Sequence, residues 1–210
     1  MTQSTQPASS DMATGAGKVF QGKALSAWRR QRREQLLRQR LEAGGRQRRV
    51  WNEAIMPVLR SLLPDARGTV YGLYWPFKGE FAIRGLMWQL HEQGGCLALP
   101  HVARPKQPLQ FLRWHPDVEM VRGVYDIPVP KDTAEVIPDV LVVPLVGFDS
   151  SGYRLGYGGG YYDRTIASMR SRPLLIGVGY ELSRLTTIYP QPHDIPMDYV
   201  VTEAGCRGCR

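Results

Sequence analysis

The chain has 210 residues, of which 43% are hydrophobic and 22% charged, as in an ordinary globular protein of one domain. Its apolar runs are too short to span a bilayer, and three cysteines are too few for a disulfide framework, so a cytoplasmic location is expected. The net charge of +8 lies within residues 22–50, which hold ten basic and two acidic residues. Residues 1–20, rich in Ser, Thr, Gln and Gly, are predicted to be a disordered leader.

Two helices are predicted at the start of the ordered chain. Residues 24–41 lack Pro and Gly, and Gly44 with Gly45 is expected to end this first helix. A second helix is predicted over residues 47–63, with a kink at Pro57. Its apolar stripe is expected to consist of Val50, Ala54, Val58 and Leu62.

Strands and helices alternate in the rest of the chain. Helices are predicted over residues 81–93 and 161–169, and strands over 69–75, 96–99, 109–114, 140–146, 174–178 and 199–202. The strand at 140–146 is apolar throughout, as in a sheet covered on both faces, whereas 109–114 is expected to be antiparallel or peripheral. The alternation predicts a largely parallel α/β sheet within one domain, residues 21–204, followed by a basic tail, residues 205–210.

The segment that follows the apolar strand 140–146 has the features of a phosphate site. Residues 154–164 read RLGYGGGYYDR, so an arginine and four glycines precede a helix start. Ligands of open α/β sheets bind beyond the carboxyl ends of the strands, and free amides at a helix N-terminus bind phosphate. A flexible surface turn is the alternative, but the order of strand, glycines and helix favours phosphate binding. A Walker A loop is excluded because Gly-Lys-Ser/Thr is absent, and Tyr161 stands where a dinucleotide fingerprint needs its third glycine.

Two aspartates could hold Mg²⁺ near that loop. Asp163 lies in the first turn of the predicted helix, where it either complements the helix dipole or binds the metal together with phosphate oxygens. A second carboxylate would be needed nearby. Asp198 precedes the last predicted strand, and on its own it is more typical of a turn residue.

The glycine segment resembles 5-formyltetrahydrofolate cyclo-ligase. The similarity includes the preceding VVPLVGFD and the later HDIPMDYVVTE (residues 193–203), and extends over about residues 73–203. It implies a three-layer α/β/α sandwich with a Rossmann-like, mostly parallel sheet. It also implies ATP-driven closure of 5-formyltetrahydrofolate to 5,10-methenyltetrahydrofolate, with release of ADP and phosphate through a phosphorylated formyl (iminium phosphate) intermediate.

The resemblance also implies roles for single residues. It places Asp163 and Asp198 as Mg²⁺ ligands. Folate is expected to contact Trp75, Glu80 and Tyr161, and the catalytic residues are expected to be Arg154 and Tyr161. The nucleotide-binding residues that it implies are Arg154, Gly156, Tyr157, Gly158, Gly159, Gly160, Tyr161 and Tyr162.

The N-terminal helix departs from the family pattern. The family has a Lys and, four residues later, an Arg on a helix that reaches the ATP phosphates, but here Lys23 is followed at that spacing by Ala27. Arg29 and Arg30 lie just beyond, so a shifted basic residue could serve. We take Lys23 and Arg30 as candidate ATP contacts, and a solvated basic face as the alternative.

Two other classes of function remain open from the sequence. The basic segment, with Trp28 and Trp51, could bind nucleic acid, although no recognition motif follows it. A sugar-phosphate isomerase or CoA transferase of similar architecture would not require ATP. A monomer is expected, without a specific nucleic-acid partner, and Cys206 with Cys209 is expected to have no metal or redox role because further ligands are missing.

Overall fold

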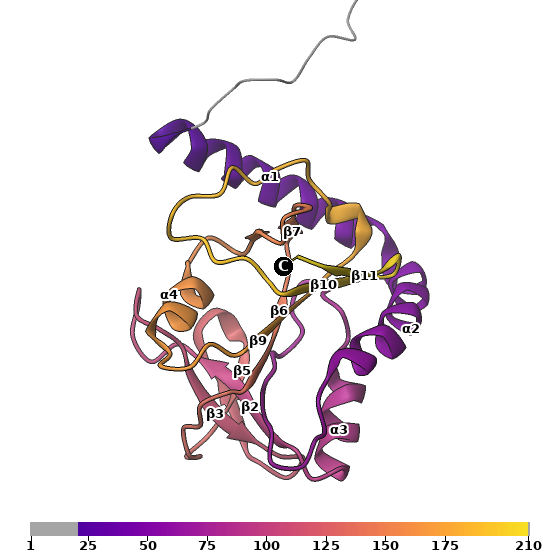
Figure 1. Cartoon of the computed structure of the whole chain (residues 1–210), viewed down its shortest axis with the longest axis vertical. Helices are drawn as coiled ribbons and strands as arrows, with labels where there is room; N and C mark the ends of the chain where they lie inside the picture. The colour runs from indigo at the N-terminus through magenta and orange to yellow at the C-terminus, as the bar shows by residue number, and fades with distance from the viewer. Residues whose placement is uncertain (1–20, 210) are drawn as a thin grey trace, which may run out of the picture.

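A seven-stranded sheet forms the centre of the protein, as a computed structural model that describes residues 21–209 shows (Figure 1). The predicted leader, residues 1–20, lies outside the described residues. The inner strands are parallel, and each edge strand is antiparallel to its neighbour. In spatial order the strands are β11 (Gly205–Gly208), β10 (Tyr199–Thr202), β9 (Leu174–Val178), β6 (Val140–Pro144), β1 (Val70–Gly72), β2 (Cys96–His101) and β3 (Gln110–Trp114). The predicted α/β class with a mostly parallel sheet is confirmed.

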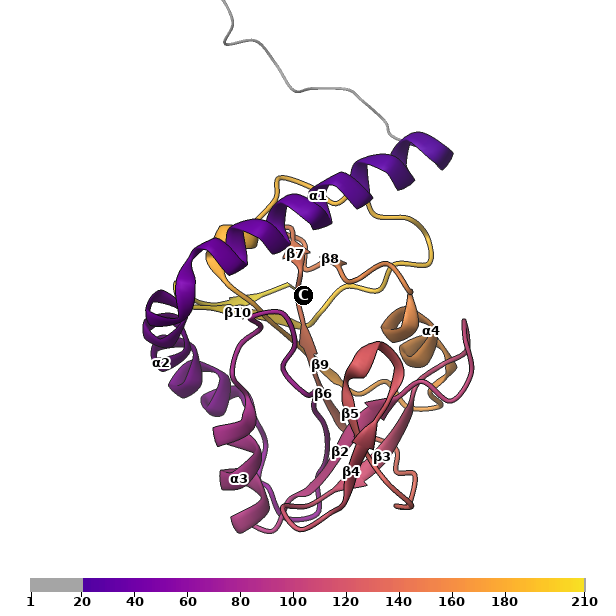
Figure 2. The ribbon, with the colours of Figure 1, turned by 180° about the vertical axis from the view of Figure 1, so that it is seen from behind.

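Both faces of the sheet are buried, because successive side chains of a strand point to opposite sides. On β6, Val140 and Val142 join the core cluster that contains residues of α2 (Gly44–Leu62) and α3 (Arg84–Glu92). Leu141 and Val143 join a second cluster, which contains Ile166 of α4 (Tyr161–Ser168). Figures 1 and 2 show α2 and α3 on one side of the sheet and α4 on the other. The apolar run at 140–146 therefore predicted its burial correctly.

The break between α1 (Gly22–Glu42) and α2 occurs one or two residues earlier than predicted. Ala43 caps α1, and α2 begins directly at Gly44, whose φ of +71° gives the left-handed conformation that glycine readily adopts. Pro57 lies within α2, and Pro64 follows its last residue by two positions. Within residues 21–209, no helix is both long and apolar enough to cross a membrane.

The predicted apolar stripe of α2 is wrong for Val50 and Ala54, which are exposed, whereas Val58 and Leu62 pack against the core as expected. Val50 is 54% exposed, whereas the fully buried residues of this helix are Ile55 and Leu59. Trp51 packs beside this pair, with its ring 4.9 Å from that of Tyr180. The helix turns its bulkier side chains to the sheet because they bury more apolar surface than Val50 and Ala54 would.

Several short elements were not predicted. They are the antiparallel pairs β4 (Met120–Arg122) with β5 (Pro128–Pro130) and β7 (Gly147–Phe148) with β8 (Arg154–Leu155), and the 3₁₀ turns η1 (Val124–Asp126) and η2 (Glu181–Ser183). Strand β11 lies in the predicted basic tail and pairs with β10, so β10 is not the last strand as predicted. Its residues have little strand propensity, and pairing with β10 decides the conformation.

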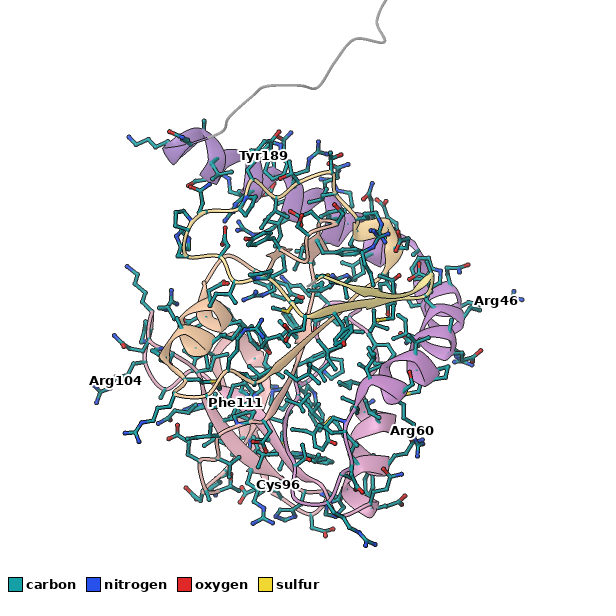
Figure 3. All side chains as sticks on the ribbon, viewed as in Figure 1. Arg46, Arg60, Cys96, Arg104, Phe111 and Tyr189 are labelled. Carbon is teal, nitrogen blue, oxygen red and sulfur yellow. The ribbon has the colours of Figure 1, made fainter. Side chains whose placement is uncertain are left out.

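The order of the strands creates a switch point between β1 and β6. From β1 the chain moves outward to β2 and β3, and then returns to β6 on the other side of β1 before it continues to β9 and β10. Open α/β sheets bind ligands at the carboxyl ends of the strands at such a point. Helix α1 packs against this edge, since Leu36 fills the space that a Cβ at Gly147 would take. Figure 3 shows Arg46, Arg60 and Arg104 at the periphery, all exposed.

Candidate functional site

The glycine loop, residues 156–160, connects β8 to α4 beyond the carboxyl end of β6. The preceding turn is fixed by the buried Asp149, whose carboxylate accepts hydrogen bonds from the amides of Ser151, Tyr153 and Ile188 at 3.1–3.2 Å. This turn directs the chain back through β8 into the loop. The predicted order of buried strand, glycines and helix is confirmed.

Two glycines of the loop have backbone conformations that other residues adopt only with strain. Gly158 has φ of +98°, and Gly160, the N-cap of α4, has φ of +63°. A Cβ at Gly159 would lie 2.6 Å from the Tyr161 ring. No described side chain caps the N-terminus of α4. Its first amides are therefore available to an anion, which the helix dipole would also favour.

Arg154 and Asp163 tie the loop to the segment before β10. Both side chains are largely buried, and they form an ion pair of 2.9 Å. Arg154 Nη1 donates to the carbonyl oxygen of Ile195 at 2.7 Å, and Asp163 Oδ1 accepts from the Ile195 amide at 3.0 Å. The guanidinium also lies 6.0 Å from the Tyr162 ring. Arg154 therefore brings a buried positive charge to the base of the glycine loop.

Asp198 has a different setting from Asp163. Its carboxylate pairs with Arg172 at 2.8 Å and accepts from the amide of Leu175, near the amino end of β9. The structure thus gives each of the two predicted metal ligands its own arginine partner. Residues 21–209 contain no group of three or more Asp, Glu, His or Cys side chains that could hold a metal ion. The shared metal site of Asp163 and Asp198 stays a prediction.

Glu80 and Tyr157 meet at the switch point. Glu80 follows β1 and is 8% exposed, and its Oε1 accepts from the Tyr157 hydroxyl of the glycine loop at 2.7 Å. Its Oε2 accepts from the amide of Phe77 at 2.9 Å, and the Phe77 and Tyr157 rings are 6.0 Å apart. Two segments that the sequence singled out separately are therefore adjacent in space.

Burial dominates the protonation of this pair. It raises the pKa of Glu80, while the hydrogen bonds from Tyr157 and Phe77 and the charge of Arg40 act in the opposite direction. Burial also raises the pKa of Tyr157, and the neighbouring Glu80 raises it further. Although 44% of Tyr157 is exposed, its hydroxyl points to the buried carboxyl group. Tyr157 consequently remains a hydrogen-bond donor.

The other predicted contact residues surround this centre. Trp75 is half-buried after β1, packs against the core, and has the Arg84 guanidinium 5.6 Å from its ring. Tyr161 opens α4, with the Arg164 guanidinium 5.2 Å from its ring. Arg164 in turn donates to the Gly159 carbonyl oxygen at 2.5 Å. The arginine thus braces the loop from its outer side.

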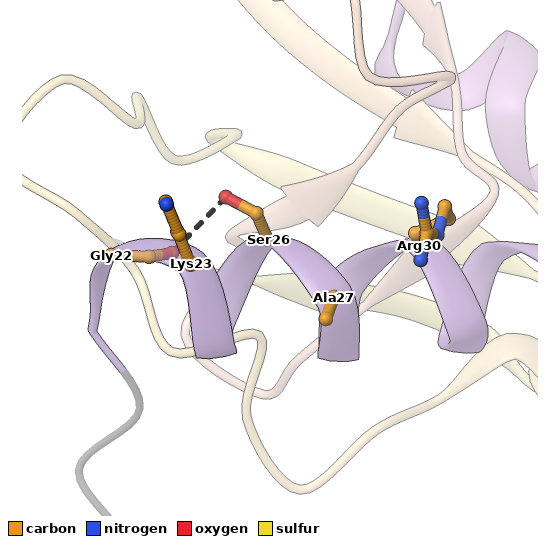
Figure 4. A pocket seen from close by; sticks show the side chains of 5 residues that line it. All are labelled: Gly22, Lys23, Ser26, Ala27 and Arg30. Atoms are coloured by element: carbon orange, nitrogen blue, oxygen red, sulfur yellow. Dashed lines mark hydrogen bonds between the residues drawn. The ribbon is translucent and has the colours of Figure 1, made fainter.

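On α1, the structure places Arg33 rather than Lys23 or Arg30 against the glycine loop. Arg33 Nε donates to the carbonyl oxygen of Gly156 at 2.8 Å, and its guanidinium lies beside Gly158. Arg29, one turn earlier, pairs with Asp194 at 2.6 Å. Figure 4 shows that Lys23 and Arg30 instead line a shallow hollow on the helix surface, together with Gly22, Ser26 and Ala27.

The comparisons with known proteins agree with this geometry. The sequence profile of the 5-formyltetrahydrofolate cyclo-ligase family matches residues 25–203. The chain belongs to the 5-formyltetrahydrofolate cyclo-ligase family.

Relatives in this family come from several bacteria. The 5-formyltetrahydrofolate cyclo-ligase of Escherichia coli is 35% identical over 149 residues, which are 66% of this chain and 80% of the relative. That of Haemophilus influenzae is 33% identical over 145 residues, 65% of this chain and 77% of the relative. The solved 5,10-methenyltetrahydrofolate synthetase of Aquifex aeolicus is 31% identical, with a TM-score of 0.75 over 87% of this chain and 93% of its own.

Sequence reasoning missed the inward face of α1 in this cyclo-ligase family member. Leu25, Arg29, Arg33, Leu36 and Arg40 recur at intervals of three and four residues, and each is buried or half-buried. Arg29 and Arg33 have the four-residue spacing that the family's basic pair shows. The signal was therefore present as a helical stripe, but it was hidden by the many other arginines of the segment.

Proposed function

We propose that the protein catalyses the ATP- and Mg²⁺-dependent cyclisation of 5-formyltetrahydrofolate to 5,10-methenyltetrahydrofolate, with release of ADP and phosphate. The observation that carries this proposal is the hydrogen bond between Tyr157 and Glu80. It joins the glycine loop, suited to nucleotide phosphates, to the loop that carries the proposed folate-binding residues Glu80 and Trp75. Family membership supports the same reaction.

The chemistry needs a better leaving group than an amide oxygen. The γ-phosphoryl group of ATP passes to the formyl oxygen, which gives an iminium phosphate and ADP. The neighbouring anilino nitrogen then attacks the formyl carbon and loses its proton, and the C–O bond breaks to release phosphate. Because acceptor and nucleophile both belong to the substrate, the protein contributes positioning, charge neutralisation and exclusion of water.

The phosphate site has the donors that this role requires. The first amides of α4 have no side-chain cap and are available to an anion, and Arg154 brings a buried positive charge to the same loop. We propose Arg33 as the basic residue of α1 that contacts the nucleotide, because it already reaches Gly156. Tyr161 is proposed to lie between nucleotide and folate, at the first position of α4.

Asp163 is better placed than Asp198 to bind Mg²⁺ beside the glycine loop. Asp163 lies in the first turn after the glycine loop, and its side chain is 20% exposed. Mg²⁺ is commonly held by one carboxylate together with phosphate oxygens and water, and it supplies charge neutralisation at the phosphates. We propose Asp163 as the protein ligand. The bonds of Asp163 to Arg154 and to the Ile195 amide both use Oδ1, whereas Arg172 bonds to both carboxylate oxygens of Asp198, whose Oδ2 also accepts from the Leu175 amide.

A single assay tests the proposed reaction. Purified protein is incubated with 5-formyltetrahydrofolate, with and without ATP and Mg²⁺, and the methenyl chromophore is followed by absorbance. We expect the chromophore only when ATP and Mg²⁺ are both present. Its absence in the complete mixture, or its formation without ATP, would contradict the proposal and favour another enzyme class. The cytoplasmic location and monomeric state stay predictions.

A further inference from the structure

Arg40 is a buried arginine whose hydrogen-bonding capacity is mostly unused. It lies in the last turn of α1 and is 1% exposed, and its Nη2 donates to the carbonyl oxygen of Leu145. Within residues 21–209, its Nε and Nη1 have no hydrogen-bond partner. Buried N–H groups are nearly always paired, because leaving one unpaired costs about 1–3 kcal/mol. These two nitrogen atoms therefore have donor capacity to spare, although the guanidinium also lies close enough to the Tyr157 hydroxyl for a side-chain hydrogen bond that opposes the rise in the Tyr157 pKa caused by burial.

The position of Arg40 shows where that acceptor would lie. Leu145 directly follows β6, so the guanidinium is anchored at the carboxyl end of this strand, at the switch point. Burial raises the pKa of Glu80, after β1, and of Tyr157, in the glycine loop, and the charge of Arg40 opposes both rises. Burial also raises the pKa of Tyr180, after β9, and the charge of Arg40 opposes that rise. The charge of Arg40 thus acts on residues in the loops that follow three neighbouring strands.

The positive charge of Arg40 favours the ionised form of Glu80. Burial favours the neutral form of Glu80. The titratable side chains that interact electrostatically with Glu80 are Arg40, Tyr74, Tyr157, Tyr162 and Tyr180. Arg40 is the only one of these five that carries a positive charge. An ionised Glu80 has acceptor capacity beyond its bonds to Tyr157 and Phe77, whereas a protonated one would leave Arg40 buried without a counter-charge.

We propose that Arg40 is a further residue of the folate site, where its buried Nε and Nη1 hydrogens are donated to an acceptor oxygen of bound folate. This inference rests on the proposed function of the site. In this arrangement two buried side chains at the switch point would contact the folate, Glu80 as a hydrogen-bond acceptor and Arg40 as a donor.

The first test separates folate binding from nucleotide binding. Arg40→Lys keeps the charge but replaces the planar fork with a single ammonium group. We expect KM for folate to rise at least about fivefold, while KM for ATP changes less than about twofold, because one hydrogen bond to a charged donor is lost only on the folate side. The control Arg38→Lys changes an exposed residue of the same helix and should match the unaltered protein. Equal effects on both substrates, or no effect, would overturn the proposal.

The second test uses binding without turnover. Thermal stabilisation by 5-formyltetrahydrofolate alone, and by ATP with Mg²⁺ alone, is measured for the protein and both lysine variants. We expect Arg40→Lys to lose most of the increase in melting temperature that folate causes (the folate shift) and to keep the increase that ATP with Mg²⁺ causes. Retention of the full folate shift contradicts the role of Arg40. Absence of product with the unaltered protein instead contradicts the proposed reaction, so the two failures are distinguishable.

The third test is the pH profile of kcat/KM for folate. Removing the guanidinium in Arg40→Gln should raise the pKa of Glu80. As the pH falls, Glu80 then becomes protonated at a higher pH than in the unaltered protein, and the acid limb of the profile moves to higher pH. Arg40→Lys keeps the positive charge, and its acid limb should stay near that of the unaltered protein. An acid limb at the same pH in a folded Arg40→Gln variant that also keeps its KM for folate would contradict the proposal. Should that variant fail to fold, the lysine variant decides through its KM values and folate shift.

Discussion

Asp163 and Asp198 illustrate how similar side chains take different roles in one fold. Each carboxylate is largely buried and pairs with an arginine, Arg154 in the first case and Arg172 in the second. Only Asp163 adjoins the glycine loop, since it lies in the first turn of α4. Asp198 accepts a hydrogen bond from the amide of Leu175 near the amino end of β9, whereas the glycine loop lies beyond the carboxyl end of the neighbouring β6. The surroundings, more than the residue type, indicate which one can share Mg²⁺ with a nucleotide.

Asparagine substitutions separate these two roles. Asp163→Asn should lower turnover at least about 100-fold and raise the Mg²⁺ requirement, because a metal ligand and its charge are removed. Asp198→Asn, the matched control, should cost about 1–3 kcal/mol of stability through the weakened bond to Arg172, with little change in the Mg²⁺ requirement. Steady-state kinetics over a Mg²⁺ titration, with urea unfolding, measure both. Full activity of Asp163→Asn at low Mg²⁺ would refute its assignment as a ligand.

At the scale of elements, the conformation of the glycine loop is as important as its sequence. Gly158→Ala would force a Cβ into a backbone with φ of +98°, where the guanidinium of Arg33 lies 3.3 Å away. Strain of this kind costs about 1–3 kcal/mol. We expect KM for ATP to rise and turnover to fall about tenfold or more.

Gly85→Ala provides the matched control for the loop. Gly85 lies in α3 with ordinary helical backbone, and the nearest atom to an added Cβ is 3.9 Å away. Alanine should therefore be neutral or stabilise the protein by about 0.5–1 kcal/mol. The comparison is made by kinetics and thermal unfolding. Wild-type kinetics for Gly158→Ala would show that the loop tolerates a side chain and does not approach phosphate closely.

A second element-scale prediction concerns how α1 is held. Arg29 bonds to Asp194 and to the carbonyl oxygens of Ile188 and Tyr189. Burial alone would raise the pKa of Asp194, but the bonds from Arg29 and the Gln191 amide together hold that pKa below its ordinary value. The stabilisation is therefore present above the unfolded pKa of 3.8 and is lost as the pH falls through the lower folded value.

Asp194→Asn tests this attachment. We expect the variant to be about 1–3 kcal/mol less stable at pH 7, because a hydrogen-bonded charge pair is broken. The difference in the free energy of unfolding between the variant and the unaltered protein should shrink progressively as the pH falls below 3.8. Urea unfolding at a series of pH values measures both quantities. A difference that is independent of pH would show that packing, and not the ion pair, holds the helix.

At the scale of the whole molecule, the order of the main helices and strands could be predicted from the sequence, but the edge strand β11 could not. The apolar run of β6 predicted a strand buried on both faces, and β9 and β10 have the predicted bounds. Strand β11 could not be foreseen, because its glycines, cysteine and arginine form a strand only by pairing with β10.

The site was predicted unevenly for a related reason. The glycine loop and Glu80 come from local motifs, and their contact confirms that the two segments adjoin. The contributions of Arg33 and Arg40 depend on which face α1 turns to the sheet, and this is decided by tertiary packing. A count of charges describes residues 22–50 as a basic segment, yet several of its arginines are bonded to the protein's own backbone.

Phosphoryl transfer in this site is proposed to go directly from ATP, held by the glycine loop, to the formyl oxygen of a folate held beside Glu80. It is tested by turnover of 5-formyltetrahydrofolate that carries ¹⁸O in its formyl group, with mass analysis of the released phosphate. Direct transfer predicts that the label appears in inorganic phosphate. Phosphate without the label, formed together with methenyl product, would contradict the account.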